Sequence, residues 1–210
     1  MRADVGMHCV LADTVVCQDE GFLEQLVCLA GTREHESILA LTARPRDVHA
    51  ALLLVGAEPG DTGSWRQGIA PNGAVTTVAI PPSGSRLSVW ARWVDGSGSE
   101  HESRLHEWVR DVNSGLVMPD GPFVFSGSIV QDVEERDASG EPTGEVRTVY
   151  AADLGGSVVG LVTFGDEVVA WQEVIPDQVD VAPAVWVADP SVIPALGTPV
   201  TLVLCVEHRQ

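Results

Sequence analysis

The chain has 210 residues, of which 30 are acidic and 12 basic, so its formal net charge is −18 at pH 7. This excess of negative charge disfavours binding to nucleic acid and to anionic membrane surfaces. Hydrophobic residues make up 45% of the chain, enough for a substantial core, but no apolar run approaches the roughly 18 residues of a membrane span.

Short strands are predicted at the start of the chain. Residues 9–31 show two apolar strands joined by a turn, and residues 37–43 form a third. Pairing the first two strands about their turn puts Cys9, Cys17 and Cys28 on one face. A Cys17–Cys28 disulfide is awkward in this pairing because the two residues lie well apart along the ladder. A diagonal Cys9–Cys28 pair fits better but strains the geometry, and three small buried hydrophobic side chains are the alternative.

A helix is predicted near residues 46–56. Pro45 suits its first turn, and Asp47 places a negative charge near the helix N-terminus. Gly56 and the Pro-Gly pair that follows it end the helix. Because Leu52–Val55 is apolar nearly all round, we expect this helix to be buried against a sheet.

The rest of the chain alternates between turn signals and short strands. Flexible loops are expected near 57–74 and 134–145. Strands are expected within 74–82, 85–95, 100–112, 123–133, 146–154, 156–171, 182–190 and 198–208. Turn signals about every 8–12 residues predict one α+β domain over residues 1–210. Its main element is expected to be a mostly antiparallel β-sheet, with one buried helix near 46–56.

The tetrapeptide Glu-His-Glu-Ser occurs twice, at 34–37 and 100–103. The second copy follows a Gly/Ser-rich hairpin turn, so a solvated position and a chance repeat are the simplest interpretation. The first copy follows a predicted strand, and one short strand separates it from His49 in the first helical turn. Because a helix N-terminus disfavours a protonated imidazole, we expect His49 to be neutral and able to accept a hydrogen bond or bind a metal.

The first copy and the helix start supply a candidate metal site. Two histidines with a carboxylate or a thiolate form a typical ligand set for zinc or copper. His35 and His49 are the candidate ligands, Glu36 is a third ligand or an orienting partner, and Cys28 is a supporting thiol.

Two other interpretations of the same residues stay open. In the first, Glu34 or Glu36 is neutralised by an arginine in a structural network that ties the loop to the helix, and the candidates are Arg33, Arg44 and Arg46. In the second, Glu34 or Glu36 is the general base of a metal-dependent hydrolase. The sequence has no HExxH, GxSxG or P-loop motif to support catalysis.

Residues 15–60 resemble the YdjY domain family, a group of bacterial, often extracytoplasmic proteins with no established reaction. The matching residues are Cys17, Gly21, Cys28, Gly31, Thr32, Glu34, His35, Glu36, Ser37, His49 and Gly56. Later matches, which extend the resemblance over nearly the whole chain, lie at 106–115, 123–128 and 197–204. The chain departs from the family pattern at Thr163, where Asn usually precedes Phe, and at Ala170–Trp171, where the family has Leu-Pro.

The resemblance implies that Cys17 belongs with Cys28, His35 and His49, whereas Cys9 and Cys205 lie outside the pattern. Family members typically begin with a leader, which implies an extracytoplasmic protein if a leader is missing from this chain and a cytoplasmic one otherwise. We expect a non-catalytic binding domain with a polar Glu/His/Cys site and zinc or copper as the candidate cofactor. A metal-dependent hydrolase and a purely structural or protein-interaction module are the alternatives, and the sequence identifies no protein partner.

Overall fold

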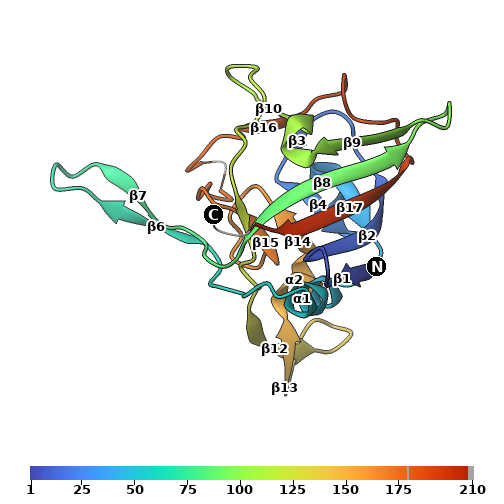
Figure 1. Cartoon of the computed structure of the whole chain (residues 1–210). Helices are drawn as coiled ribbons and strands as arrows, with labels where there is room; N and C mark the ends of the chain where they lie inside the picture. Colours follow the sequence, from blue (N-terminus) through green and yellow to red (C-terminus); the bar gives the residue numbers. More distant parts are fainter. Residues whose placement is uncertain (179, 208–210) are drawn as a thin grey trace.

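The computed structural model describes residues 1–178 and 180–207 and consists mostly of β-structure (Figure 1). Within these residues, eight strands form the wall of a barrel. In order around it they are β2 (Cys9–Val16), β17 (Pro199–Val206), β8 (Arg86–Val94), β11 (Phe123–Val124), β15 (Val169–Trp171), β14 (Ser157–Gly160), β4 (Gln25–Leu29) and β5 (Ser37–Leu41). The barrel is closed because β5 also pairs with β2. The β4–β5 and β14–β15 pairs are parallel, and the other wall pairs are antiparallel.

The barrel encloses an apolar core because side chains on successive strand residues point to opposite faces. In β2, Val10 and Ala12 are buried while Asp13 is exposed. In β8, Leu87 and Val89 are buried in the same alternating manner. In these strands the alternation keeps an acidic side chain such as Asp13 on the outside of the barrel.

Smaller elements surround the barrel. Two strands extend its sheet: β1 (Arg2–Asp4) beside β2, and β9 (Glu100–Arg104) beside β8. A separate sheet contains β10 (Val109–Asp111), β16 (Trp186–Ala188) and β3 (Phe22–Leu23). Two-stranded arms extend away from the body in Figure 1: β6 (Ser64–Ile69) with β7 (Val75–Ile80), and β12 (Val130–Arg136) with β13 (Pro142–Tyr150). The 3₁₀ helices are η1 (Glu34–Glu36) and η2 (Leu105–Trp108).

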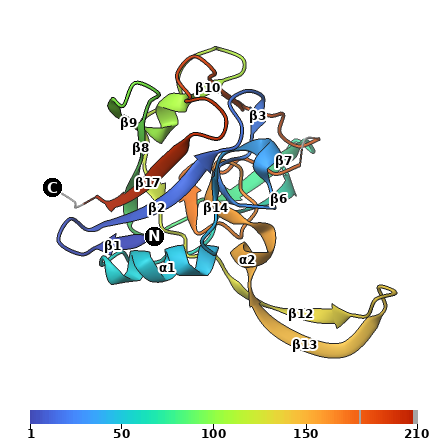
Figure 2. The ribbon, with the colours of Figure 1, turned by 90° about the vertical axis from the view of Figure 1, so that its right-hand side faces the viewer.

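Helices α1 (Pro45–Leu54) and α2 (Ala151–Gly155) contact each other and lie beneath the barrel in Figure 2. α1 buries Val48 and Leu52, whereas Leu53 and Leu54 are exposed. The helix predicted near 46–56 is therefore confirmed, but only one of its faces is buried. None of the described helices is long and apolar enough to cross a membrane.

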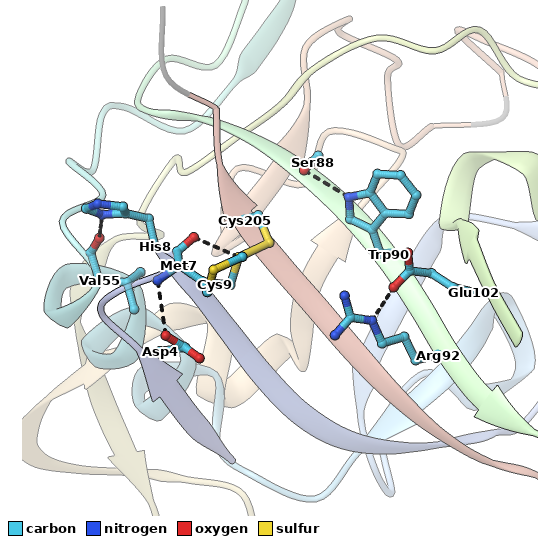
Figure 3. Close-up of a disulfide and its surroundings, with 10 residues drawn as sticks. All are labelled: Asp4, Met7, His8, Cys9, Val55, Ser88, Trp90, Arg92, Glu102 and Cys205. Atoms are coloured by element: carbon cyan, nitrogen blue, oxygen red, sulfur yellow. Dashed lines mark hydrogen bonds and ion pairs between the residues drawn. A yellow bond between two sulfur atoms is a disulfide. The ribbon is translucent and has the colours of Figure 1, made fainter. Parts of the chain in front are cut away.

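The Cys9–Cys205 disulfide joins β2 to β17, the wall strands nearest the two chain ends (Figure 3). The two residues face each other in the ladder, with Cα atoms 4.1 Å apart and a sequence separation of 196. Beside them, the Nδ1–H of His8 donates to the Val55 carbonyl at 2.9 Å, which ties the turn before β2 to the end of α1. Of the two alternatives left open for Cys9, a diagonal pair with Cys28 and a small buried side chain, neither included this crosslink to Cys205.

The predicted α+β class is also wrong, because the described chain is a closed, mostly-β barrel with two short α-helices. Closure depends on strands far apart in the sequence, such as β2 and β17, which local patterns do not specify. The strands predicted within 9–31 exist, but β2 and β4 lie on either side of β5 and do not form a hairpin. Residues 57–74 include strand β6, and residues 134–145 cover the end of the β12–β13 arm.

Candidate functional site

A cavity of about 440 Å³ lies beside His49, where α1 approaches the turn after β11 and the start of the β12–β13 arm. Its lining combines polar groups with a proline and a valine: Arg46, His49, Pro59, Gly60, Gly127, Ser128, Val130 and Tyr150. These residues come from four separate segments of the chain, which the barrel and its helices bring together. We refer to this cavity as the His49 pocket.

The His49 ring is held in place by hydrogen bonds and by aromatic neighbours. Its Nδ1 lies 3.0 Å from the Gly127 carbonyl oxygen and 2.9 Å from the Tyr150 hydroxyl. Phe125 and Tyr150 both contact the ring edge-on, with centroid distances of 4.9 and 5.6 Å. Because a carbonyl oxygen can only accept, Nδ1 carries the proton that points at Gly127. In the neutral imidazole, the other ring nitrogen, Nε2, then has the lone pair that can receive a hydrogen bond.

Tyr150 contributes a hydroxyl that stays protonated. Burial raises its pKa above the ordinary value of 10.0. The hydroxyl donates to the Gly127 carbonyl at 2.9 Å, the same oxygen that faces His49. Neither sequence periodicity nor spacing indicates this tyrosine as a site residue, because it joins the pocket only through the fold of the arm.

The turn at Gly127 and Ser128 is shaped for this pocket. Gly127 has φ +84°, and a Cβ atom there would lie 2.8 Å from Cβ of Pro59 and 3.4 Å from Cε1 of His49. Ser128 also has a positive φ, of 55°, and its Oγ accepts a hydrogen bond from the backbone N–H of Ala152 at 3.1 Å. Gly127 and Ser128, the end of the segment 123–128 that matches the family pattern, thus line the His49 pocket.

Arg46 lies at the edge of the pocket and is already paired. Its Nε donates to the Asp153 carboxylate, and its backbone N–H donates to Oδ1 of the same residue at 3.0 Å. The guanidinium is half exposed while Asp153 is mostly covered. The positive charge of Arg46 is therefore largely offset before any ligand enters.

The first tetrapeptide forms η1, which connects the parallel strands β4 and β5. Its first glutamate, Glu34, accepts a hydrogen bond from the backbone N–H of Gly31, and this contact lowers the Glu34 pKa. The side chain of His35 is 77% exposed, with Nε2 3.7 Å from a Glu36 oxygen. His35 therefore projects into solvent and contributes little to packing.

Arg33 organises the polar side of this loop. Its Nε donates to the Gly155 carbonyl at 3.0 Å, one terminal nitrogen lies 3.4 Å from Glu36, and the guanidinium stacks 4.0 Å above the Phe164 ring. Glu24 adds a second carboxyl, and its pKa is raised to about 7 by partial burial and by its hydrogen bond with Glu36. The Arg33–Glu36 contact is one that the structural interpretation allowed, but Arg33 ties the loop to the end of α2 and not to the helix near 46–56.

The free thiols of Cys17 and Cys28 lie next to each other, close to Ser37. Cys28 is fully buried, and the Cys17 thiol donates to the Ser37 carbonyl at 3.1 Å. The hydrogen bond between the two thiols, together with burial, raises the pKa of Cys17, which stays protonated. The predicted separation of these two cysteines is wrong because β2 and β4 do not form a hairpin.

The structure does not bring the four predicted metal ligands together. His49 contacts Gly127 and Tyr150, His35 and Glu36 lie on η1, and Cys28 contacts Cys17. Across the described residues, no three His, Cys, Asp or Glu side chains are grouped as a metal ion would require. The predicted ligands thus lie in three places: His49 in its pocket, His35 and Glu36 on η1, and Cys28 beside Cys17.

The second tetrapeptide lies on β9, on the outer face of the sheet. His101 stacks on Trp93, with centroids 5.1 Å apart, and its Nε2 lies 2.8 Å from Asp95. Arg92 and Glu102 pair beside it (Figure 3). A hollow of about 790 Å³ runs along this face, but its charged side chains are largely paired with neighbours on the same sheet.

A protein-family model described as the YdjY domain matches residues 2–205. No curated protein and no solved structure matches the chain. The matched range includes the His49 pocket, η1 with Arg33 before it, and both free thiols, so these features lie within the family region. The chain belongs to the YdjY domain family.

Proposed function

We propose that this protein is a binding domain that holds a small organic ligand in the His49 pocket without transforming it. The observation that carries the proposal is the meeting of two distant segments of the family pattern, at His49 and at Gly127–Ser128, around one cavity. Its volume of about 440 Å³ falls within the usual range for small-molecule sites. The half-buried hydroxyl of Tyr150 adds a polar group at a fixed position.

The lining favours a neutral ligand that has a hydrogen-bond donor and an apolar body. The donor would face Nε2 of His49, and the apolar part would contact Pro59 and Val130. An anionic ligand is less well matched because Arg46 is paired with Asp153. Metal binding and metal-dependent hydrolysis receive no comparable support, since the other predicted ligands lie outside this pocket.

Binding without catalysis is favoured by how the polar groups are used. The Tyr150 hydroxyl and the Ser128 Oγ are both engaged with backbone groups. Neither is arranged as a nucleophile next to a free base. These groups are suited to orienting a ligand and to excluding water from one side of it.

We further propose that the domain acts outside the cytoplasm. The Cys9–Cys205 disulfide supports this location, because structural disulfides persist in oxidising compartments. Thiol counting on denatured protein from the native host should give two free thiols for Cys17 and Cys28. Four free thiols would contradict the proposed location.

The ligand proposal can be tested with a library of neutral aromatic fragments that carry N–H or O–H donors, screened by ligand-observed NMR. Val130→Trp should fill the pocket, because Val130 lines it and is 67% exposed. Val146→Trp is the matched control: Val146 is 63% exposed on the same arm but does not line the pocket. Hits should be lost in Val130→Trp and His49→Phe and kept in Val146→Trp. Hits that survive all three changes would place binding elsewhere.

A further inference from the structure

The β6–β7 arm exposes apolar side chains on a ribbon that extends away from the barrel (Figure 1). Ile69 is 80% exposed, Val75 70% and Ile80 59%. An isolated two-stranded ribbon is only marginally stable in water, and clustered exposed apolar side chains are typical of interaction surfaces. The arm therefore has the properties of a surface that binds another protein chain.

The charge of this arm differs from that of the rest of the molecule. Residues 64–82 contain one charged side chain, Arg66, and no acidic residue, although the chain as a whole has a net charge of −18. The other arm, residues 130–150, has six acidic residues and two arginines. Two copies of so acidic a chain repel each other, so self-association is least opposed where acidic residues are missing. The β6–β7 arm is such a place, and it extends away from the acidic body.

Strand β7 leaves one edge of the arm open. Its sequence, Val-Thr-Thr-Val-Ala-Ile, has no charge, proline or glycine, and its register with β6 runs without a bulge. Charged residues, prolines and bulges normally protect an exposed edge from pairing with another chain, and β7 has none of them. Strand β6 has Arg66 and Gly68, so β7 is the less protected edge.

The backbone pattern shows which groups of β7 are available. The Ala70 N–H donates to the Ala74 carbonyl at 2.8 Å, which makes this pair hydrogen-bonded. Hydrogen-bonded and non-bonded pairs alternate along an antiparallel ribbon. By this alternation, the hydrogen-bonded pairs of the ribbon are Gly68–Thr76, Arg66–Val78 and Ser64–Ile80. The backbone groups of Val75, Thr77 and Ala79 consequently point away from β6.

We propose that this protein forms a homodimer in which β7 of one copy pairs antiparallel with β7 of a second copy. A two-fold axis at Thr77 places Val75 opposite Ala79 of the second copy and uses all three sets of outward backbone groups. The result is a four-stranded sheet with a self-complementary, closed contact. On one face, the existing Ile69–Val75 and Trp65–Ala79 pairs continue into those of the second copy.

Proline substitutions on the two edges of the arm test this pairing in the full chain. Thr77→Pro removes an outward N–H that β6 does not use, whereas Gln67→Pro does the same on the opposite edge, directly across the ribbon. Sedimentation velocity should show a dimer for the wild type and for Gln67→Pro. Thr77→Pro should weaken the dimer roughly 100-fold, because two hydrogen bonds across the axis are lost.

A cysteine at the axis gives an independent readout. Thr77→Cys should form a dimer linked by a disulfide under mild oxidation, since the two Thr77 positions face each other, and Gln67→Cys should not. The proposal is overturned if the wild type remains monomeric at about 100 μM. Equal weakening by the two proline variants, or a dimer that Thr77→Cys fails to crosslink, would also overturn it.

Discussion

The Tyr150 hydroxyl lies 2.9 Å from Nδ1 of His49, and both groups also lie within 3.0 Å of the Gly127 carbonyl oxygen. Helix α1, the turn after β11 and the end of β13 thus meet in one triangle of polar atoms. Because the carbonyl can accept two hydrogen bonds but donate none, it fixes the proton on Nδ1 and orients the phenol. This triangle makes the His49 pocket a rigid, preformed feature of the fold.

The ionisation of Tyr150 should reveal this environment directly. The chain has one tyrosine, so the ultraviolet absorbance of phenolate reports on Tyr150 alone. In the folded protein its titration should occur above the ordinary pKa of 10.0, because burial disfavours the charged form. The raised pKa contributes stability that is fully present below pH 10.0 and is lost as pH rises through the folded-state pKa. A folded protein that titrates like the denatured chain would contradict the buried position.

Gly127→Ala should lower the free energy of unfolding more than an equivalent change elsewhere. Both the positive φ of +84° and the close approach of Pro59 and His49 oppose a Cβ atom. We expect a loss of roughly 2–3 kcal/mol in urea denaturation. Gly98→Ala is the control, because Gly98 has φ +85° with open space around it, and should lose roughly 1 kcal/mol. Equal losses would mean that the pocket can relax around the added methyl group.

Much of the local structure, but not its assembly, could be predicted from the sequence. The strands around 9–31 and the helix near 46–56 follow from apolar runs bounded by Gly and Pro. The closed barrel does not, because the β2–β17 ladder joins residues nearly 200 apart and the β4–β5 pair is parallel across a short connection. Local hydrophobic patterns specify which face of a strand is buried, but they do not specify its partner.

The candidate site shows the same division between local and long-range information. His35 and His49 are close in sequence and both belong to the family pattern, so a shared site was a reasonable prediction. In the structure, His35 is exposed on η1, whereas His49 is held by Tyr150, which lies 101 positions after it in the sequence. The Arg33–Glu36 contact, by contrast, spans three residues and could be anticipated as a local network.

Glu167 should make stability depend on pH in the weakly acidic range. Its side chain is buried, Oε1 accepts a hydrogen bond from the Gly165 N–H at 3.2 Å, and Oε2 has no hydrogen-bond partner among the described atoms. Burial raises its pKa from 4.5 to about 7. Because the folded-state value is the higher one, the stabilising contribution is present below pH 4.5 and is lost as pH rises through about 7.

Glu167→Gln removes this ionisation and keeps an oxygen acceptor. The free energy of unfolding of the wild type, relative to Glu167→Gln, should fall by about 3 kcal/mol between pH 4.5 and pH 8. Glu141→Gln, at an exposed position in the β12–β13 arm, controls for the change in net charge. A parallel pH dependence in the wild type and in Glu167→Gln would assign the effect to other carboxylates.

Loss of the Cys9–Cys205 disulfide should destabilise the barrel strongly. The crosslink spans 196 residues, so opening it frees nearly the whole unfolded chain, and the Cys9→Ser/Cys205→Ser variant should lose roughly 3–5 kcal/mol. Reductant should lower the wild type to the same value and leave the double variant unchanged, because Cys17 and Cys28 are free thiols. If reductant also destabilised the double variant, the adjacent Cys17 and Cys28 thiols would have formed a second disulfide. That disulfide would link the end of β2 covalently to β4.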